Sequence, residues 1–157
     1  MAELFRSSHS VYDCRYHLVW STKYRKRALV EPEEKNSCKE ILRETAEQYG
    51  YKLYEIEVDT DHVHIYIGIP PQDSVGKAVR VLKSLSARHV FKMFPYMRKK
   101  YWAGEFWEAS YFVRSIGEGV TAEMVKNYIR QHENKLEPAQ AKLLLEIKPT
   151  KKRERCS

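Results

Sequence analysis

Residues 51–69, with the sequence YKLYEIEVDTDHVHIYIGI, decide the fold that this chain is expected to adopt. Residues 51–58 alternate apolar and polar side chains, and residues 62–69 are rich in β-branched side chains, so both segments are typical of β-strands. Between them lie residues 59–61 (DTD), which favour a turn. Because this connection is so short, we expect the two strands to pair as an antiparallel hairpin.

One helix is expected before this hairpin and one after it. The first begins at Pro32, which is followed by two acidic residues that favour the positive end of a helix dipole, and it ends at Gly50. The second is capped by Asp73 or Ser74, and its apolar residues recur at spacings of three and four. Each helix therefore has one face that can pack against a sheet.

Further strands are expected at residues 14–20 (CRYHLVW) and 110–116 (SYFVRSI), and a last helix at residues 121–136. The order strand, helix, strand, strand, helix, strand is that of the split βαβ, ferredoxin-like or RRM-like sandwich. The sequence thus predicts an α+β fold, with an antiparallel sheet, helices on one face and an added C-terminal helix. We expect one domain over residues 1–137 and a basic tail over residues 138–157.

The composition restricts the class of protein. The formal net charge is +7, which favours an anionic partner, and nucleic acid is the commonest one. The three cysteines are far apart and form no C-x-x-C pair, which argues against a disulfide framework and a cysteine zinc site. The sequence contains no apolar run long enough to span a membrane, and we expect no signal peptide. We expect a cytoplasmic protein, associated with the nucleoid when it acts.

His62 and His64 are separated by one residue within a predicted strand. Residues two apart in a strand point to the same side, so the two imidazoles can share one divalent cation. The plainer interpretation is that they line a half-polar face of the sheet.

Tyr128 lies in the predicted last helix, where His132 shares its face because residues four apart are neighbours on a helix. The plainer interpretation is a core tyrosine, since an apolar stripe surrounds it: Val125, Ile129 and Leu136. A buried histidine on that stripe needs a polar partner, however, and a metal site would supply one.

A basic segment follows the first predicted strand: Lys23, Tyr24, Arg25, Lys26 and Arg27. Cations that alternate with an aromatic ring suit a phosphate backbone and a stacked base. A solvated basic loop is the alternative.

Four segments together resemble the HUH-type single-tyrosine transposases of the smallest insertion sequences, the TnpA-like family. They are YHLVW-STKYR, D-HVH-IYIGIP, FWEASYFVRSIG and VKNYIRQHE, and with their spacings they cover about residues 12 to 136. The resemblance implies that His62 and His64 bind the catalytic metal, magnesium or manganese, and that Tyr128 is the nucleophile. The family's third ligand, typically glutamine, matches the position of His132, with Gln131 as the alternative.

The resemblance also implies the reaction and the partners. Tyr128 would attack single-stranded DNA to give a 5′-phosphotyrosine and a free 3′-hydroxyl, and hairpins at the ends of the element would be recognised. The family works as a homodimer with shared active sites. Residues 117–119 (GEG) would then be a flexible joint that lets the last helix dock on a neighbour, although a tight turn explains these glycines equally well.

Three other functions remain open at this point. A replication initiator or relaxase can carry the same two-histidine motif. A non-catalytic nucleic-acid-binding module would explain the charge but not the histidines or Tyr128. A domesticated relative could bind hairpins without mobilising DNA.

Overall fold

The structure, a computed structural model, describes residues 4–6, 8–100, 104–117, 127 and 130. The predicted last helix, with Tyr128, Gln131 and His132, therefore lies outside the described residues except for two positions, as does the predicted basic tail. Within the described part of the chain, no helix is long and apolar enough to cross a membrane.

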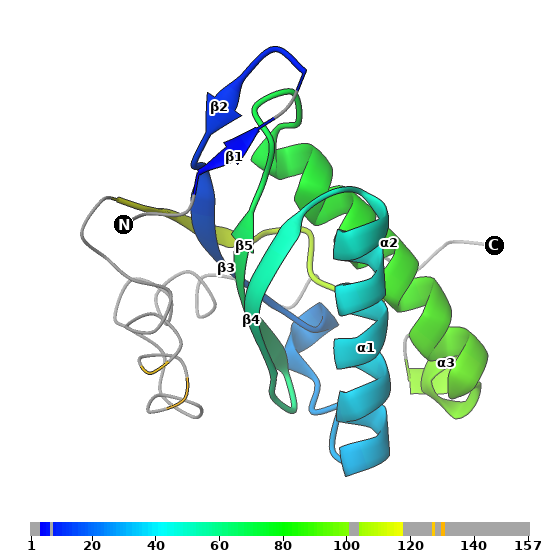
Figure 1. Cartoon of the computed structure of the whole chain (residues 1–157). Helices are drawn as coiled ribbons and strands as arrows, with labels where there is room; N and C mark the ends of the chain where they lie inside the picture. The colour runs from blue at the N-terminus through cyan, green and yellow to red at the C-terminus, as the bar shows by residue number, and fades with distance from the viewer. Residues whose placement is uncertain (1–3, 7, 101–103, 118–126, 128–129, 131–157) are drawn as a thin grey trace, which may run out of the picture.

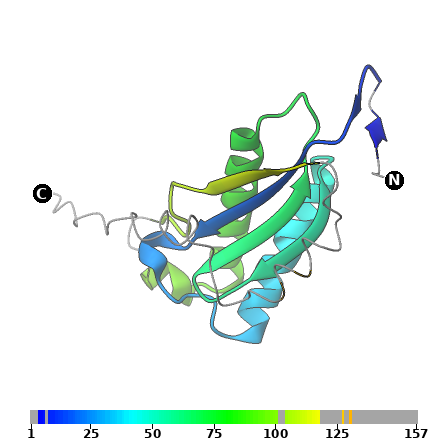
Figure 2. The same ribbon diagram turned by 90° about the vertical axis from the view of Figure 1, so that its left-hand side faces the viewer.

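A four-stranded antiparallel sheet is the centre of the fold, with strand order β4-β5-β3-β6 (Figure 1). The strands are β3 (Arg15–Ser21), β4 (Lys52–Val58), β5 (His62–Gly68) and β6 (Phe112–Ile116). Helices α1 (Pro32–Gln48) and α2 (Val75–Met93) lie side by side on one face of this sheet (Figures 1 and 2). The α+β sandwich predicted from the sequence is confirmed.

Smaller elements surround this sandwich. A two-stranded hairpin of β1 (Phe5–Arg6) and β2 (Val11–Tyr12) precedes it, a turn of 3₁₀-helix (η1, Lys23–Arg25) follows β3, and α3 (Tyr96–Lys100) follows α2. None of these short elements was predicted from the sequence, because two to five residues carry too little periodicity to identify a strand or helix.

Local interactions fix the start of both long helices and the end of the first. Glu31 and Glu34 form a reciprocal capping box at the start of α1, and Gly50 lies just after its end with a φ of 75°. At the start of α2, the Ser74 hydroxyl accepts a hydrogen bond from the backbone amide of Lys77 at 3.0 Å. Of the two caps that the sequence allows, Ser74 is therefore the one used.

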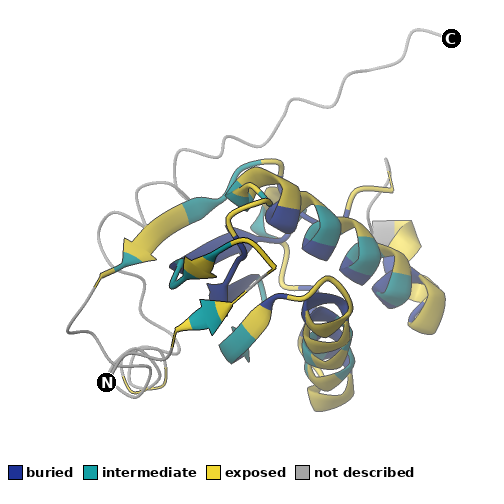
Figure 3. Cartoon of the chain, turned by 45° about the horizontal axis from the view of Figure 1, so that its top comes forward, coloured by how far each residue is buried: buried dark blue, intermediate teal, exposed yellow. Residues whose placement is uncertain are grey.

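Alternation along the strands divides the sheet into two chemically different faces. Leu18, Trp20 and Ile65 are fully buried in the core between the sheet and the helices. Each helix is buried on the side that faces the sheet and exposed on the other side (Figure 3). The neighbouring positions on the same strands, His17 and His64 among them, point to the opposite face. This second face carries the polar residues of the site described below.

The spacing of three and four in the sequence extends the predicted apolar stripe of α2 to Met93, but this residue is not part of the core. Met93 is 53% exposed, whereas Phe91 is buried and packs edge-on against Phe106, with ring centroids 5.7 Å apart. The aromatic segment after α2 offers this contact, so the last turn of the helix buries Phe91 instead.

Candidate functional site

His62 and His64 lie next to each other on β5, on the sheet face opposite the helices. Their ring centroids are 5.1 Å apart, and the residues are only 5% and 4% exposed. Because β5 lies between β3 and β4, it cannot move independently of the sheet. The alternation in the sequence correctly places both imidazoles on the same side.

The His62 ring is oriented by the residue before it. A carboxylate oxygen of Asp61 lies 2.7 Å from His62 Nδ1. Burial opposes ionisation of Asp61, but the hydrogen bond and charge of His62, together with the charge of Arg25, lower the pKa of this carboxyl. The carboxylate can therefore accept a hydrogen bond from Nδ1–H, which places the lone pair of the neutral ring on Nε2.

The His64 ring is oriented by a histidine of another strand. His17 Nε2, on β3, lies 3.1 Å from His64 Nδ1. Burial, followed by the nearby His62 and His17, lowers the pKa of His64 to about 3. His64 is therefore a neutral imidazole at physiological pH, as a metal ligand must be. In the tautomer in which His64 Nδ1 donates to His17 Nε2, the lone pair of His64 lies on its Nε2.

Nε2 of His62 and Nε2 of His64 are both buried and have no hydrogen-bond partner within the described residues. Buried polar atoms are rarely left unpaired, and two neighbouring imidazole nitrogens fit a divalent cation. In the described ranges no group of three or more histidine, cysteine or acidic residues could hold a metal ion. The pair therefore fits as two ligands of a site whose remaining ligands come from elsewhere.

The position of His17 leads to a prediction about metal affinity. His17→Phe keeps the size of the buried ring but removes the nitrogen beside His64, so the metal affinity is expected to fall about 10- to 100-fold. Titration calorimetry with Mn²⁺ measures this change. His17→Gln, which keeps a hydrogen-bond acceptor, should bind Mn²⁺ more tightly than the phenylalanine variant. Equal affinity of wild type and His17→Phe would contradict this role.

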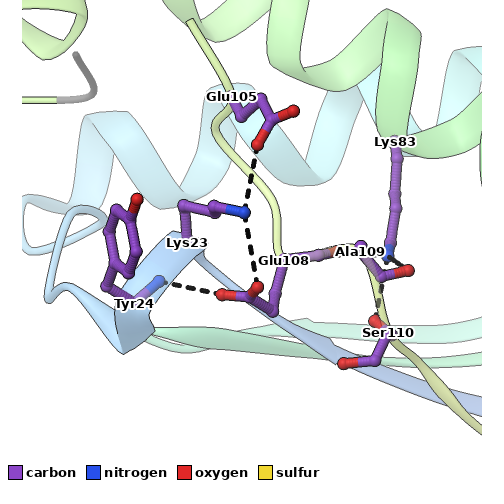
Figure 4. A network of polar contacts seen from close by, with 7 residues as sticks. All are labelled: Lys23, Tyr24, Lys83, Glu105, Glu108, Ala109 and Ser110. Atoms are coloured by element: carbon purple, nitrogen blue, oxygen red, sulfur yellow. Dashed lines mark hydrogen bonds and ion pairs between the residues drawn. The ribbon is translucent and has the colours of Figure 1, made fainter. Parts of the chain in front are cut away.

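The basic segment forms the η1 turn beside this site, and two acidic residues fix its shape. Tyr24 has a φ of 59°, which is strained for a residue other than glycine. Its backbone amide donates to a carboxylate oxygen of Glu108 at 3.0 Å, and the amino group of Lys23 lies 3.0 Å from Glu105 and 3.5 Å from Glu108 (Figure 4). Lys23 is therefore a structural cation whose charge is largely balanced.

The remaining residues of this segment differ in solvent exposure and in ion pairing. Arg25 is 3.3 Å from Asp61, so it supports the carboxylate that orients His62. Lys26 and Arg27 are exposed, and the Tyr24 ring is 40% exposed, with the amino group of Lys26 at 5.7 Å from its centroid. The five residues thus contain two ion-paired cations and an exposed group of one ring and two cations.

One described residue near Tyr128 contacts the histidine face of the sheet. Arg130 Nη2 lies 3.1 Å from Glu55 Oε2 on β4. Glu55 pairs with Tyr66 on β5, so it lies on the same face as His64, two residues along that strand. The chain at residue 130 therefore returns to the face that carries the two histidines.

Sequence comparisons identify close relatives. A family model described as "Transposase IS200 like" matches residues 10–132. The ISDra2 transposase TnpA of Deinococcus radiodurans is 36% identical over 131 residues, which cover 83% of this chain and 93% of that protein. The transposase for insertion sequence element IS200 of Salmonella typhimurium is 32% identical over 123 residues, which cover 78% of this chain and 79% of that protein.

Solved structures agree with the fold. A crystal structure of a candidate transposase from Deinococcus radiodurans R1 is 38% identical, with a TM-score of 0.66, and the match covers 81% of this chain and 96% of that one. A REP-associated tyrosine transposase bound to a REP hairpin has a TM-score of 0.52 at 12% identity, covering 85% of this chain and 74% of that one. The second likeness concerns the fold alone.

Proposed function

The chain belongs to the IS200-like transposase family, and from this we propose that it cleaves and rejoins single-stranded DNA through a covalent bond to Tyr128. The observation that carries the proposal is the pair of buried Nε2 atoms of His62 and His64, which have no hydrogen-bond partner among the residues that the structure describes. They would hold a divalent metal, magnesium or manganese. We propose His132 as the third ligand, because it lies four positions after Tyr128, and Gln131 as the alternative.

The described side chains prepare this site before DNA arrives. Asp61 and His17 hold the two imidazoles in the tautomer that directs each Nε2 toward the shared position. When bound, the metal would neutralise charge on the scissile phosphate and orient the leaving oxygen. The contact of Arg130 with Glu55 supports the proposal, because Arg130 follows Tyr128 by two positions in the sequence and Glu55 lies on the histidine face of the sheet.

In the proposed step, the Tyr128 oxygen bonds to phosphorus while the bond from phosphorus to the 3′-oxygen breaks. The phenol loses one proton and the 3′-oxygen gains one, so a 5′-phosphotyrosine and a 3′-hydroxyl result. Only about one phenol in a thousand is ionised at pH 7 when its pKa is near 10, so the phenol must be activated, and Lys126 and the metal are the two candidates. Rejoining reverses these bonds and needs no ATP.

The proposal is tested by a denaturing gel with a single-stranded oligonucleotide labelled at its 3′ end in Mn²⁺, because the proposed step leaves the 3′ fragment on the protein. A labelled band that runs with the protein supports it, and a non-catalytic DNA-binding module gives none. A replication initiator or relaxase is not proposed, because the matching family is that of IS200-like transposases.

We also propose that the substrate strand carries a hairpin, which the hairpin-bound relative of the same fold supports. The exposed part of the basic segment would then contact the unpaired flank of that hairpin. This assigns the phosphate contacts to Lys26 and Arg27, whereas Lys23 and Arg25 are held by acidic residues.

Neutralising Lys26 and Arg27 together, each to glutamine, is expected to weaken the binding of unpaired DNA. Each lost phosphate contact lowers the salt slope of the affinity by about 0.7 for single strands, so the double variant should lose about 1.4 units. Fluorescence anisotropy over a salt series measures this slope. The matched control is Lys39→Gln with Arg43→Gln on α1, which should leave the slope unchanged. An unchanged slope in the first variant would show that the segment is only a solvated loop.

The homodimer with shared active sites also remains a proposal. The alternative is that the segment with Tyr128 docks on the sheet of its own chain, and the ion pair between Arg130 and Glu55 within one chain favours this arrangement. Mixing two inactive variants distinguishes these arrangements: Tyr128→Phe, and His62→Ala with His64→Ala. If the sites are shared, one of the two active sites in each mixed dimer is intact, because it receives Tyr128 from one chain and both histidines from the other. The second site is then defective in both parts, so up to half of the sites in mixed dimers should regain cleavage. No recovery, with subunit exchange shown by crosslinking, would establish that each chain completes its own site.

A further inference from the structure

A groove of about 680 Å³ lies on the outer surface of α1 and α2, where the two helices run side by side (Figure 1). Ile41 and Met93 give it an apolar part, and Met93 is 53% exposed. Ser37 on α1 and His89 on α2 meet across it, with Oγ and Nε2 3.0 Å apart. Three exposed carboxylates complete its lining: Glu33, Glu40 and Glu44.

The negative charge of this groove is not balanced within the described ranges. None of its three carboxylates forms an ion pair with a described residue, and no described lysine or arginine lines the groove. The Tyr96 phenol donates to Glu34 at 2.6 Å, and this hydrogen bond, with the charges of Glu33 and Glu31, raises the pKa of Tyr96 to about 12. In a chain with a net charge of +7, this face therefore repels DNA and attracts a cationic, partly apolar partner.

The strength of the groove indicates a partner that is tethered to it. Exposed ion pairs each contribute little to binding, and two apolar side chains offer a small contact area. A separate protein would therefore bind here only weakly. A segment of the same chain is present at an effective concentration in the millimolar range, so a dissociation constant of about 1 mM is enough to keep it bound.

The basic tail, residues 138–157, has the chemistry that the groove lacks. It lies outside the described residues and beyond residue 132, where the match to the transposase family ends. Its sequence contains six basic and two acidic side chains. Four large aliphatic side chains precede the basic run at residues 151–155: Leu143, Leu144, Leu145 and Ile147. The tail can therefore offer apolar contacts and cations from adjacent parts of one segment.

The tail can reach the groove from the last described residue. Arg130 contacts Glu55 on β4, which is an edge strand of the sheet and packs against α1. Twelve positions separate Arg130 from Lys142, and an extended chain of that length spans about 40 Å. Since a helix with its side chains is only about 10–12 Å wide, this length is sufficient to pass round the edge of the sheet and across α1.

We propose that the groove between α1 and α2 binds the basic tail of the same chain. The aliphatic side chains of the tail pack against Ile41 and Met93, and its cations pair with Glu33, Glu40 and Glu44. This inference is independent of the proposed function, because neither the metal site nor Tyr128 takes part in it.

The first test is crosslinking of the full-length protein, without DNA, by a carbodiimide, which joins a lysine amino group to a carboxylate that it contacts. Mass spectrometry should find tail lysines joined to Glu40 or Glu44, whereas Glu47, which is exposed on α1 outside the groove, should give none. Raising the salt from 0.1 to 1 M shortens the Debye length from about 10 to about 3 Å, so the yield should fall several-fold. An equal mixture of ¹⁴N and ¹⁵N protein shows whether the joined peptides come from one chain.

The second test measures the mobility of the tail through the fluorescence anisotropy of a dye on Cys156. Cys14→Ser removes the other accessible thiol, because Cys38 is fully buried. Replacing Glu40 and Glu44 with glutamine should release the tail and lower the anisotropy to the value that the unchanged groove shows in 1 M salt.

The matched control is Gln48→Lys with Gln72→Lys, which changes the net charge equally at exposed positions outside the groove. Its anisotropy should equal that of the unchanged protein. A charge exchange shows that the contact is direct. Changing both groove glutamates to lysine should release the tail, and adding Lys151→Glu with Lys152→Glu should restore the anisotropy.

Three results would overturn the inference. Tail crosslinks that avoid the groove would place the tail elsewhere. Joined peptides that combine both nitrogen isotopes would show that the tail of a second copy occupies the groove. Equal anisotropy of the glutamine variant and its control would show that the groove carboxylates do not hold the tail.

Discussion

Tyr128→Phe is expected to lose covalent attachment to single-stranded DNA completely. The substitution removes only the phenolic oxygen, which is the atom that bonds to phosphorus in the proposed step. Loss of a nucleophile in a comparable covalent mechanism lowers kcat by on the order of 10⁶, so no product should be visible on a denaturing gel. Binding of a hairpin oligonucleotide should be unchanged, because phosphate contacts do not depend on this oxygen.

Tyr24→Phe is the matched control for this variant. It removes a phenolic oxygen from an exposed ring near the histidine pair, and it keeps the ring on which a base could stack. This variant should form the covalent product at the wild-type rate. If Tyr128→Phe still forms the product, another residue is the nucleophile, and the assignment by family resemblance is wrong.

Replacing His62 and His64 together with alanine is expected to abolish metal binding as well as cleavage. The two Nε2 atoms are the proposed metal ligands, and the described residues contain no group of three histidine, cysteine or acidic side chains that could replace them. Titration calorimetry with Mn²⁺ should therefore show no saturable binding, and the covalent product should fall below detection. Each single variant should retain weak metal binding.

A different histidine supplies the control for the double variant. His89 lies on α2, where its Nε2 is 3.0 Å from the Ser37 hydroxyl on α1, on the helix side of the sheet. His89→Ala should keep Mn²⁺ affinity and cleavage, and circular dichroism should show that both proteins are folded. Undiminished cleavage by the double histidine variant would eliminate the proposed metal site.

The features that the sequence predicts correctly are those that depend on near neighbours. The hairpin of β4 and β5 follows from alternation and a short turn, and the common orientation of His62 and His64 follows from the two-residue period of a strand. The boundaries of α1 follow from a proline and acidic residues in its first turn and from a glycine just after its end. In each case the deciding contacts lie within a few residues.

The features that the sequence does not reveal depend on residues far apart in the chain. His17, which orients His64, lies 47 positions before it in the sequence. The alternation of residues in β3 does place His17 on the polar face of the sheet, but it does not reveal which residue His17 contacts. Lys23 belongs to the predicted DNA-binding segment, but Glu105 and Glu108 balance its charge from more than 80 positions away. A charge pattern alone cannot distinguish such an ion-paired cation from one that is free to bind phosphate.

The central claim is a bond between Tyr128 and the 5′-phosphate of cleaved DNA, and peptide mapping by mass spectrometry tests it most directly. The protein is incubated with a single-stranded oligonucleotide and Mn²⁺, denatured, and digested with trypsin and nuclease. The account predicts a nucleotide mass on the peptide Asn127–Arg130, located on Tyr128 by fragmentation. A covalent product whose nucleotide is found on any other residue, or an active preparation in which this peptide is unmodified, would contradict it.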